Sequence, residues 1–214
     1  MVEFINFEEI IDREFKEEVK PRPPNTLYCS EIGYCLRRIY LNCITPKETP
    51  VEVMRKFAVG NMIHDRVTSI LRKTFDSVSS EQSVVMYLDA IDFRVLGRYD
   101  DIIHQDEGKI LLEKKSVNTL KFIDKPIHHH LIQTHLYMKC LGMDKAQIMY
   151  IEKNTFKTKT FNIKFQHWIF QEAMHRINII ANALKTKRTP APEARNNMRM
   201  KWQCRYCPFY RECS

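Results

Sequence analysis

The sequence lacks any long hydrophobic run. No stretch approaches the roughly 18 uncharged apolar residues that a membrane-spanning helix needs. The N-terminal segment over 1–15 is acidic and has no small-residue cleavage site, which argues against a signal peptide. Glycine is scarce, with 5 among 214 residues, and no low-complexity tract interrupts the chain. These absences predict an intracellular, cytoplasmic protein without a membrane partner, of a length that suits one domain.

The cysteines are odd in number, at seven, and no secretion signal accompanies them. This argues against a disulfide scaffold and for reduced thiols. The C-terminus carries Cys204-x-x-Cys207 followed by Cys213. A CxxC pair presents two thiolates to one metal, and Cys213 can supply a third. We expect the fourth thiolate to come from Cys35, with Cys29 as its rival.

The kind of metal at these cysteines, the role of two other cysteines and the role of a histidine run are separate questions. Four cysteines do not by themselves distinguish zinc from an iron–sulfur cluster, so both stay open at this point. Cys43 and Cys140 fall in apolar helical stretches, where we expect buried structural thiols. The run of three histidines at 128–130 is expected to cap a solvated helix start rather than to bind a metal.

Basic residues exceed acidic ones by 34 to 26, which gives a net charge of +8. A basic excess suits a polyanionic partner such as nucleic acid or an acidic membrane surface. The tail over 195–211 mixes cations with aromatic residues, which could hold a phosphate backbone and stack unpaired bases. Alternatively, these aromatics pack around the cysteines, and Arg37 and Arg38 beside Cys35 carry the same ambiguity.

The periodicity of the apolar residues predicts helices around a group of short strands. The expected helices cover 5–20, 30–41, 51–75, 127–142 and 165–187. The expected strands cover 83–89, 93–104, 109–117, 146–152 and 157–163. The inward residues expected in the longest helix are Phe57, Ile63, Val67, Ile70 and Leu71. The fold class is therefore α/β, with a central mixed sheet flanked by helices.

The strand over 109–117 changes from apolar to charged at Glu113, Lys114 and Lys115. Side chains of a strand alternate between its two faces. Glu113 and Lys115 are therefore expected on one face and Lys114 on the other. A solvated strand end with a salt bridge is the structural alternative.

A second carboxylate precedes this strand, at Asp100. If the two strands pair through the tight turn at 106–108, Asp100 lies beside Glu113. Two carboxylates on adjacent strands suit a hard divalent cation, and a nearby lysine can stabilise charge on a phosphate. Asp101 competes with Asp100 for this position, and the spacing from Gly97 favours Asp100.

Four short motifs in this order resemble the RecB-type branch of the PD-(D/E)xK nucleases. They are Gly60-x-x-x-His64, Gly97-x-x-Asp100, Glu113-x-Lys115 and Gln133-x-x-x-Tyr137. The resemblance implies a restriction-endonuclease-like core. It also implies that Mg²⁺ or Mn²⁺ is bound by Asp100, Glu113, the backbone carbonyl of Lys114 and His64. Lys115 would be the catalytic lysine, and Gln133 and Tyr137 would support the site or contact DNA.

The cysteine pattern is similar to that of the CRISPR-associated iron–sulfur exonuclease family, which has archaeal viral relatives. This similarity implies a 4Fe–4S cluster held by Cys35, Cys204, Cys207 and Cys213. It further implies a single RecB-like nuclease domain over 1–214, in which 1–50 and 188–214 together form the iron–sulfur cluster region.

The same resemblance implies a DNA exonuclease that acts mainly on single strands, from 5′ to 3′. Its role would be CRISPR spacer acquisition in antiviral defence, with the CRISPR integrase complex as a partner and with homo-oligomers in some relatives. One alternative is a viral or host nuclease of DNA recombination and repair. Another is a catalytically silent DNA-binding subunit of an adaptation complex, although Asp100, Glu113 and Lys115 are all intact.

Overall fold

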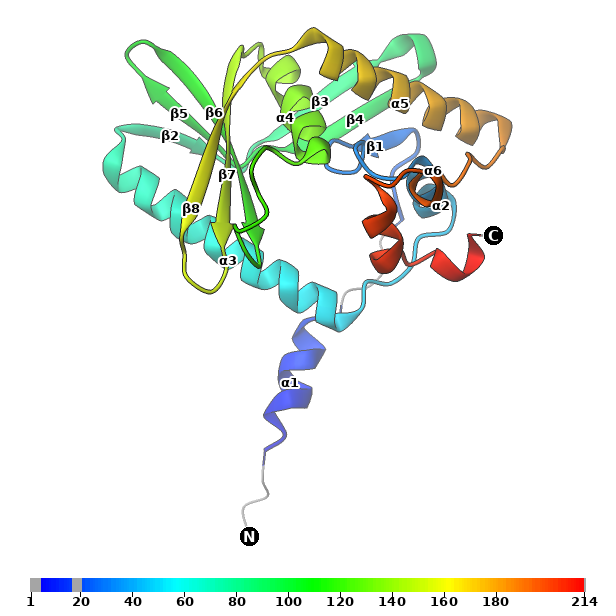
Figure 1. Cartoon of the computed structure of the whole chain (residues 1–214), viewed down its shortest axis with the longest axis horizontal. Helices are drawn as coiled ribbons and strands as arrows, with labels where there is room; N and C mark the ends of the chain where they lie inside the picture. Colours follow the sequence, from blue (N-terminus) through cyan, green and yellow to red (C-terminus); the bar gives the residue numbers. More distant parts are fainter. Residues whose placement is uncertain (1–4, 17–20, 214) are drawn as a thin grey trace.

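The computed structural model describes residues 5–16 and 21–213. The expected helix over 5–20 is present as α1 (Phe7–Glu14), and its last expected residues lie outside the described ranges. The side chain of Asn6 accepts a hydrogen bond from the backbone of Glu9 and so begins this helix. Figure 1 shows α1 projecting from the rest of the molecule, next to the start of α3 (Val51–Thr74), and Arg55 of α3 pairs with Asp12 of α1.

Two sheets form the centre of the molecule, where the sequence predicted one. The first has the order β1 (Thr26–Tyr28), β4 (Phe93–Arg98), β3 (Ser83–Leu88). The second has the order β2 (Ser77–Ser80), β5 (Asp101–Gln105), β6 (Gly108–Val117), β7 (Lys145–Glu152), β8 (Thr158–Lys164). The β1–β4 and β6–β7 pairs are parallel, and the other pairs are antiparallel. The predicted α/β class with mixed pairing is confirmed.

The predicted strand over 93–104 is wrong as one unit, because the chain changes sheets in its middle. β4 ends at Arg98 and β5 begins at Asp101. Between them, the backbone of Tyr99 bonds to Gln82 and the carbonyl of Asp100 accepts from Glu81. The sequence also missed β1 and β2, which have only 3 and 4 residues and no clear alternation. The break places Asp100 at the junction of the two sheets.

Helices cover both faces of the five-stranded sheet (Figure 1). α3 (Val51–Thr74) packs Ile63 and Val67 against Ile151 on one face. α4 (His128–Leu141) and α5 (His167–Thr186) belong to the larger core on the other face. The expected inward positions of Phe57 and Ile70 are wrong, and both are exposed. Phe57 lies more than one turn before Ile63, and beside Ile70 it is Leu71 that packs against this cluster.

α2 (Leu36–Ile44) begins at Cys35, so the helix start expected at Ser30 is wrong. Two contacts hold the preceding loop in shape. The Glu31 carboxylate accepts a hydrogen bond from the backbone of Tyr28 and pairs with Arg22. Gly33 lies where a Cβ atom would come 2.5 Å from the Cα of His129. The loop therefore packs closely against the start of α4, which requires glycine at this position.

The C-terminal tail returns to this loop and to α2 (Figure 1). It contains α6 (Glu193–Asn196) and the short 3-10 helices η2 (Lys201–Tyr206) and η3 (Tyr210–Glu212), while η1 (Asp89–Ile91) links β3 to β4. Arg176 of α5 donates to the carbonyl of Ile32 at 2.7 Å and pairs with Glu193 at 2.7 Å. In the described part of the chain, no helix is both long and apolar enough to cross a membrane.

Candidate active site

Asp100, His64 and Lys115 line one cleft. Glu113 is 1% exposed and lies behind that lining, in contact with Lys115. The Oδ2 atom of Asp100 accepts from the backbone N–H of Lys114 at 2.6 Å. The Nδ1 atom of His64 lies 3.5 Å from Oδ1 of Asp100. The Nζ atom of Lys115 lies 2.6 Å from Oε1 of Glu113. The cleft lining and the buried Glu113 behind it therefore bring together two carboxylates, an imidazole and an ammonium group.

Gln133 and Tyr137 fix the position of the Lys115 ammonium group. Lys115 donates to Oε1 of Gln133 at 2.9 Å, and Gln133 donates to the Tyr137 hydroxyl at 3.1 Å. That hydroxyl donates to the carbonyl of Arg98 at 3.0 Å. A Cβ atom at Gly97 would come 2.3 Å from the Tyr137 ring, so only glycine leaves room for it. The glycine, glutamine and tyrosine of the motifs thus act as one support.

The electrostatics of the two carboxylates differ. Burial raises the pKa of Glu113 to about 7, and the charge of Asp100 adds to this against the opposing effect of Lys115. Burial also opposes the charge of Asp100, but hydrogen bonding and attraction from His64 and attraction from Lys115 lower its pKa overall. The buried Oε2 atom of Glu113 has no hydrogen-bond partner among the described residues. This oxygen is an available electron-pair donor, and Glu113 lies near enough to Asp100 for the two charges to repel each other.

Asp101 does not share the cleft with Asp100. It points to the α3 face of β6, where Oδ2 lies 2.7 Å from the Nζ atom of Lys114. Both side chains are completely buried, and Thr68 bonds to each of them. Lys114 also donates to the backbone carbonyl of His64 at 3.1 Å. The sequence motifs gave no role to this buried pair, which holds α3 and the cleft-lining His64 against the sheet.

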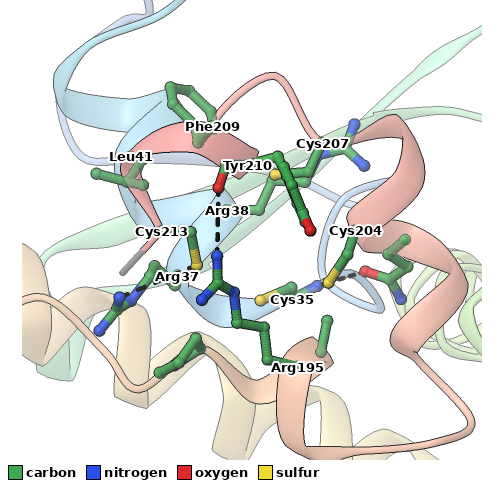
Figure 2. A pocket seen from close by; sticks show the side chains of 13 residues that line it. Cys35, Arg37, Arg38, Leu41, Arg195, Cys204, Cys207, Phe209, Tyr210 and Cys213 are labelled. Atoms are coloured by element: carbon green, nitrogen blue, oxygen red, sulfur yellow. Dashed lines mark hydrogen bonds between the residues drawn. The ribbon is translucent and has the colours of Figure 1, made fainter.

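Four cysteines line one pocket, here called the thiol pocket: Cys35, Cys204, Cys207 and Cys213. In Figure 2 their sulfur atoms point into the same space, with the guanidinium of Arg195 beside them. Cys35 is the N-terminal cap of α2, and its backbone N–H donates to Gln203 of η2 at 2.8 Å. Burial, together with repulsion from the Cys35 and Cys213 thiolates, raises the pKa of Cys207.

The remaining cysteines lie elsewhere. Cys29, the rival of Cys35, is buried beside Gly97, and burial raises its pKa. Cys43 and Cys140 are half-buried and pack against the main core, and burial raises the pKa of each. Burial keeps all three thiols protonated at neutral pH.

The expectation for the three histidines at 128–130 is wrong for two of them. His128 is exposed and bonds to Glu172 at 2.9 Å. His129, only 9% exposed, packs its ring against the tail residue Trp202, with 5.5 Å between ring centroids. His130 bonds to the hydroxyl of Tyr150 at 3.0 Å. The physical reason is that the N-terminal loop and the tail cover the start of α4.

We expect His129 to make folding stability depend on pH. Burial, with repulsion from Lys115, His128 and Arg38, lowers its pKa from 6.5 to about 4. The unfolded chain therefore takes up a proton first, so stability is complete above pH 6.5 and falls as the pH drops towards 4. The loss between pH 7 and pH 5 should be on the order of 2 kcal/mol. Urea unfolding at both pH values measures it.

The variant His129→Gln should show a smaller fall in unfolding free energy over this pH interval. The same substitution at the exposed His175 is the matched control and should leave the fall unchanged. Equal pH dependence in the wild type and in His129→Gln would contradict the assignment.

As they stand, no three His, Cys, Asp or Glu side chains within 5–16 and 21–213 are arranged to hold a metal ion. Behind the cleft, one oxygen of Glu113 is paired with Lys115. In the thiol pocket the four sulfur atoms point into one space, and a guanidinium nitrogen of Arg37 lies 4.0 Å from the Sγ atom of Cys213.

Helices on both faces of a mixed sheet, with a carboxylate–x–lysine strand beside a second carboxylate, define an α/β nuclease core. The chain belongs to the PD-(D/E)XK nuclease superfamily, whose family model matches residues 13–214. No curated protein sequence matches the chain significantly.

Solved structures share this fold. The crystal structure of SSO0001 is similar with a TM-score of 0.70 and 21% identity, over 97% of this chain and 95% of that one. The alkaline exonuclease LHK-Exo from Laribacter hongkongensis is similar with a TM-score of 0.55 and 13% identity, over 76% of this chain and 89% of that one. The structure of LHK-Exo in complex with dAMP has a TM-score of 0.52 and 14% identity, over 84% of this chain and 93% of that one. At these identities the likeness concerns the fold alone.

Proposed function

We propose that this protein is a metal-dependent DNA exonuclease that cuts mainly single strands, from 5′ to 3′. The observation that carries the proposal is that Asp100 and Lys115 line one cleft, with Glu113 paired to Lys115 directly behind it. LHK-Exo, an exonuclease that binds dAMP, has the same fold. The cysteine pattern resembles the CRISPR-associated family, so we place the activity in DNA trimming for spacer acquisition, with the integrase complex as a partner.

The cleft residues fit a divalent cation. Carboxylate oxygens are the ligands that Mg²⁺ and Mn²⁺ prefer. Oε2 of Glu113 has no partner among the described residues, and the charges of Glu113 and Asp100 are near enough to repel each other, which a bound cation would relieve. We propose Asp100, Glu113, His64 and the backbone carbonyl of Lys114 as the residues that would hold it. When bound, such an ion would polarise the phosphate and acidify a water molecule.

The chain's own residues then have separate roles. Before an ion binds, His64 keeps Asp100 ionised, since its hydrogen bonding and attraction lower the pKa of that carboxyl; with the ion present, neutral His64 would be a ligand instead. Lys115 supplies a positive charge at a fixed position, because Gln133 and Glu113 both bind its Nζ atom. A fixed cation beside a phosphate stabilises the negative charge that develops there during cleavage. Tyr137 prevents Gln133 from turning away.

The thiol pocket fits a metal cluster. Four thiols from distant segments share one space, and a metal that coordinates thiols removes their protons and so makes them thiolate ligands. We propose that Cys35, Cys204, Cys207 and Cys213 hold a 4Fe–4S cluster, with zinc as the rival ion. It would fasten the tail, within 188–214, to the N-terminal segment, within 1–50, and would serve a structural purpose.

End-labelled DNA tests the nuclease. Protein purified without oxygen would be incubated with single-stranded or duplex DNA in Mn²⁺, Mg²⁺ or chelator. We expect metal-dependent products that shorten from the 5′ end, with the single strand cut faster. Products that are independent of the metal, or no products at all, would remove the proposal. Internal cuts without an end preference would replace the exonuclease by an endonuclease.

The cysteine assignment predicts a loss of bound metal. Cys207→Ser should abolish the brown colour and the iron content of the purified protein, because three thiolates hold the cluster weakly. Cys43→Ser is the control and should keep both, since Cys43 lies outside the thiol pocket. Metal analysis of both variants is the measurement. Zinc without iron in the wild type would replace the cluster by a zinc site.

A further inference from the structure

A cavity of about 330 Å³, here called the side cavity, adjoins the active-site cleft. Its size falls within the roughly 300–1,000 Å³ that is common for pockets holding small organic ligands. Four residues line both spaces: Ser30, Phe57, Lys115 and Gln133. A group bound in the side cavity therefore lies next to the lysine that faces the two carboxylates.

Aromatic rings form one wall of the side cavity. The rings of Tyr34 and His129 lie 4.9 Å apart between centroids, and both line the cavity. Trp202 of the tail extends this group, at 5.5 Å from His129 and 6.3 Å from Tyr34. The Trp202 side chain is 46% exposed. Ring faces of this kind stack with the flat faces of nucleic-acid bases, whatever the base.

Two polar side chains of the same wall have neither a hydrogen bond nor an ion pair among the described residues. The first is His129, whose ring accepts and donates no hydrogen bond there although the residue is only 9% exposed. Its lowered pKa leaves the imidazole neutral, with one donor and one acceptor. Arg38 lies over the Tyr34 ring at 4.9 Å and pairs with no carboxylate in the described ranges. The guanidinium is thus available to a phosphate.

We propose that the side cavity binds the unpaired base of the nucleotide next to the scissile phosphate. The proposal rests on the nuclease function proposed above and names its substrate feature. The base stacks on the face of the Tyr34 ring that Arg38 leaves free, His129 bonds to the edge of the base, and Arg38 holds the adjoining phosphate. A base within a duplex has its edge occupied by the other strand, so the cavity selects single strands. Because Trp202 belongs to the tail, the thiol pocket region contributes to this selection.

Binding without cleavage tests the proposal. Fluorescence anisotropy of a labelled oligodeoxythymidine, in chelator, gives the dissociation constant. We expect Tyr34→Leu to weaken binding about tenfold, since stacking on one aromatic residue is worth that much. Tyr34→Phe keeps the ring and should bind like the wild type. Tyr87→Leu, at an exposed tyrosine of β3 outside the side cavity, is the matched control.

A second arm changes the DNA and leaves the protein intact. Oligonucleotides with one abasic site, moved along the strand, should lose about tenfold in binding to the wild type at one position. The Tyr34→Leu variant should show no further loss there, because the base and the ring remove the same contact. Thermal melting of each variant verifies folding.

The possible outcomes distinguish a failure of the base site from a failure of the proposed nuclease function. Wild-type binding by Tyr34→Leu, or an abasic loss that persists in that variant, would overturn the base site while metal-dependent cleavage could stand. Tyr34-dependent binding without any cleavage in Mn²⁺ would keep the base site and remove the nuclease function.

Discussion

Replacing Lys115 by alanine should reduce the rate of DNA cleavage about 10³-fold, the effect of removing one fixed group that stabilises transition-state charge. Lys115 is held by Gln133 and Glu113 and faces Asp100 across the cleft. Burial opposes the charge on Lys115, but attraction from Glu113 and Asp100 raises its pKa, so the ammonium stays charged. Single-turnover cleavage of end-labelled DNA in Mn²⁺ is the measurement.

The same strand provides a control for this variant. Lys109 is exposed at the start of β6, so Lys109→Ala changes the overall charge equally without touching the cleft. We expect it to cleave DNA at the wild-type rate. Glu113→Gln keeps the shape of the side chain and removes the carboxylate, and it should lose activity to a similar extent as Lys115→Ala. Cleavage within tenfold of the wild type by either active-site variant would exclude the proposed roles.

The second large effect concerns stability. Lys114→Met should lower the unfolding free energy by about 3–5 kcal/mol, because it leaves the carboxylate of Asp101 buried without its cation. Both side chains are completely buried, and their contact is 2.7 Å. Thr68 and Ser80 bond to Asp101 as well, but hydroxyl groups do not neutralise its charge. Urea unfolding, with the slope of the transition recorded, is the measurement.

A double variant separates charge from shape. Lys114→Met combined with Asp101→Asn removes both charges and should recover most of the lost stability, whereas Asp101→Asn alone leaves Lys114 unpaired. Lys109→Met, at the exposed end of the same strand, should change stability little. If Lys114→Met loses less than about 1 kcal/mol, or the double variant recovers nothing, the ion pair is not what holds α3 to the sheet.

The ion pair between Lys114 and Asp101 follows from a pattern in the sequence, but the nuclease motifs name only the neighbouring residues. Glu113 and Lys115 face the cleft, so Lys114 between them must face the opposite side of the strand. Asp101 follows Asp100 by one residue and turns away from the cleft in the same manner. A charged residue directed into a core requires a partner of opposite charge. The outward turn of Lys114 on one strand and of Asp101 on the next could therefore have predicted that the two side chains pair.

Local patterns were sufficient for the parts of the fold and site that depend on neighbouring residues. Alternation along β6 determined which side chains share a face. Helical spacing placed Gln133 and Tyr137 on one face of α4, where they now form one hydrogen-bonded support. Gly142, which has a left-handed backbone conformation, ends that helix at the boundary expected from the sequence. Such features involve residues a few positions apart, so the sequence alone determines them.

Contacts between distant segments could not be predicted in this way. The break after Arg98 depends on Gln82 and Glu81 of other segments, so the alternation over 93–104 could not reveal it. Likewise, His129 is covered by a tail that returns from 73 positions further along the chain, at Trp202. The sequence by itself determined the order and spacing of the candidate catalytic and thiol groups. Only the tertiary structure decided which faces are covered, because burial depends on which distant segment packs on each face.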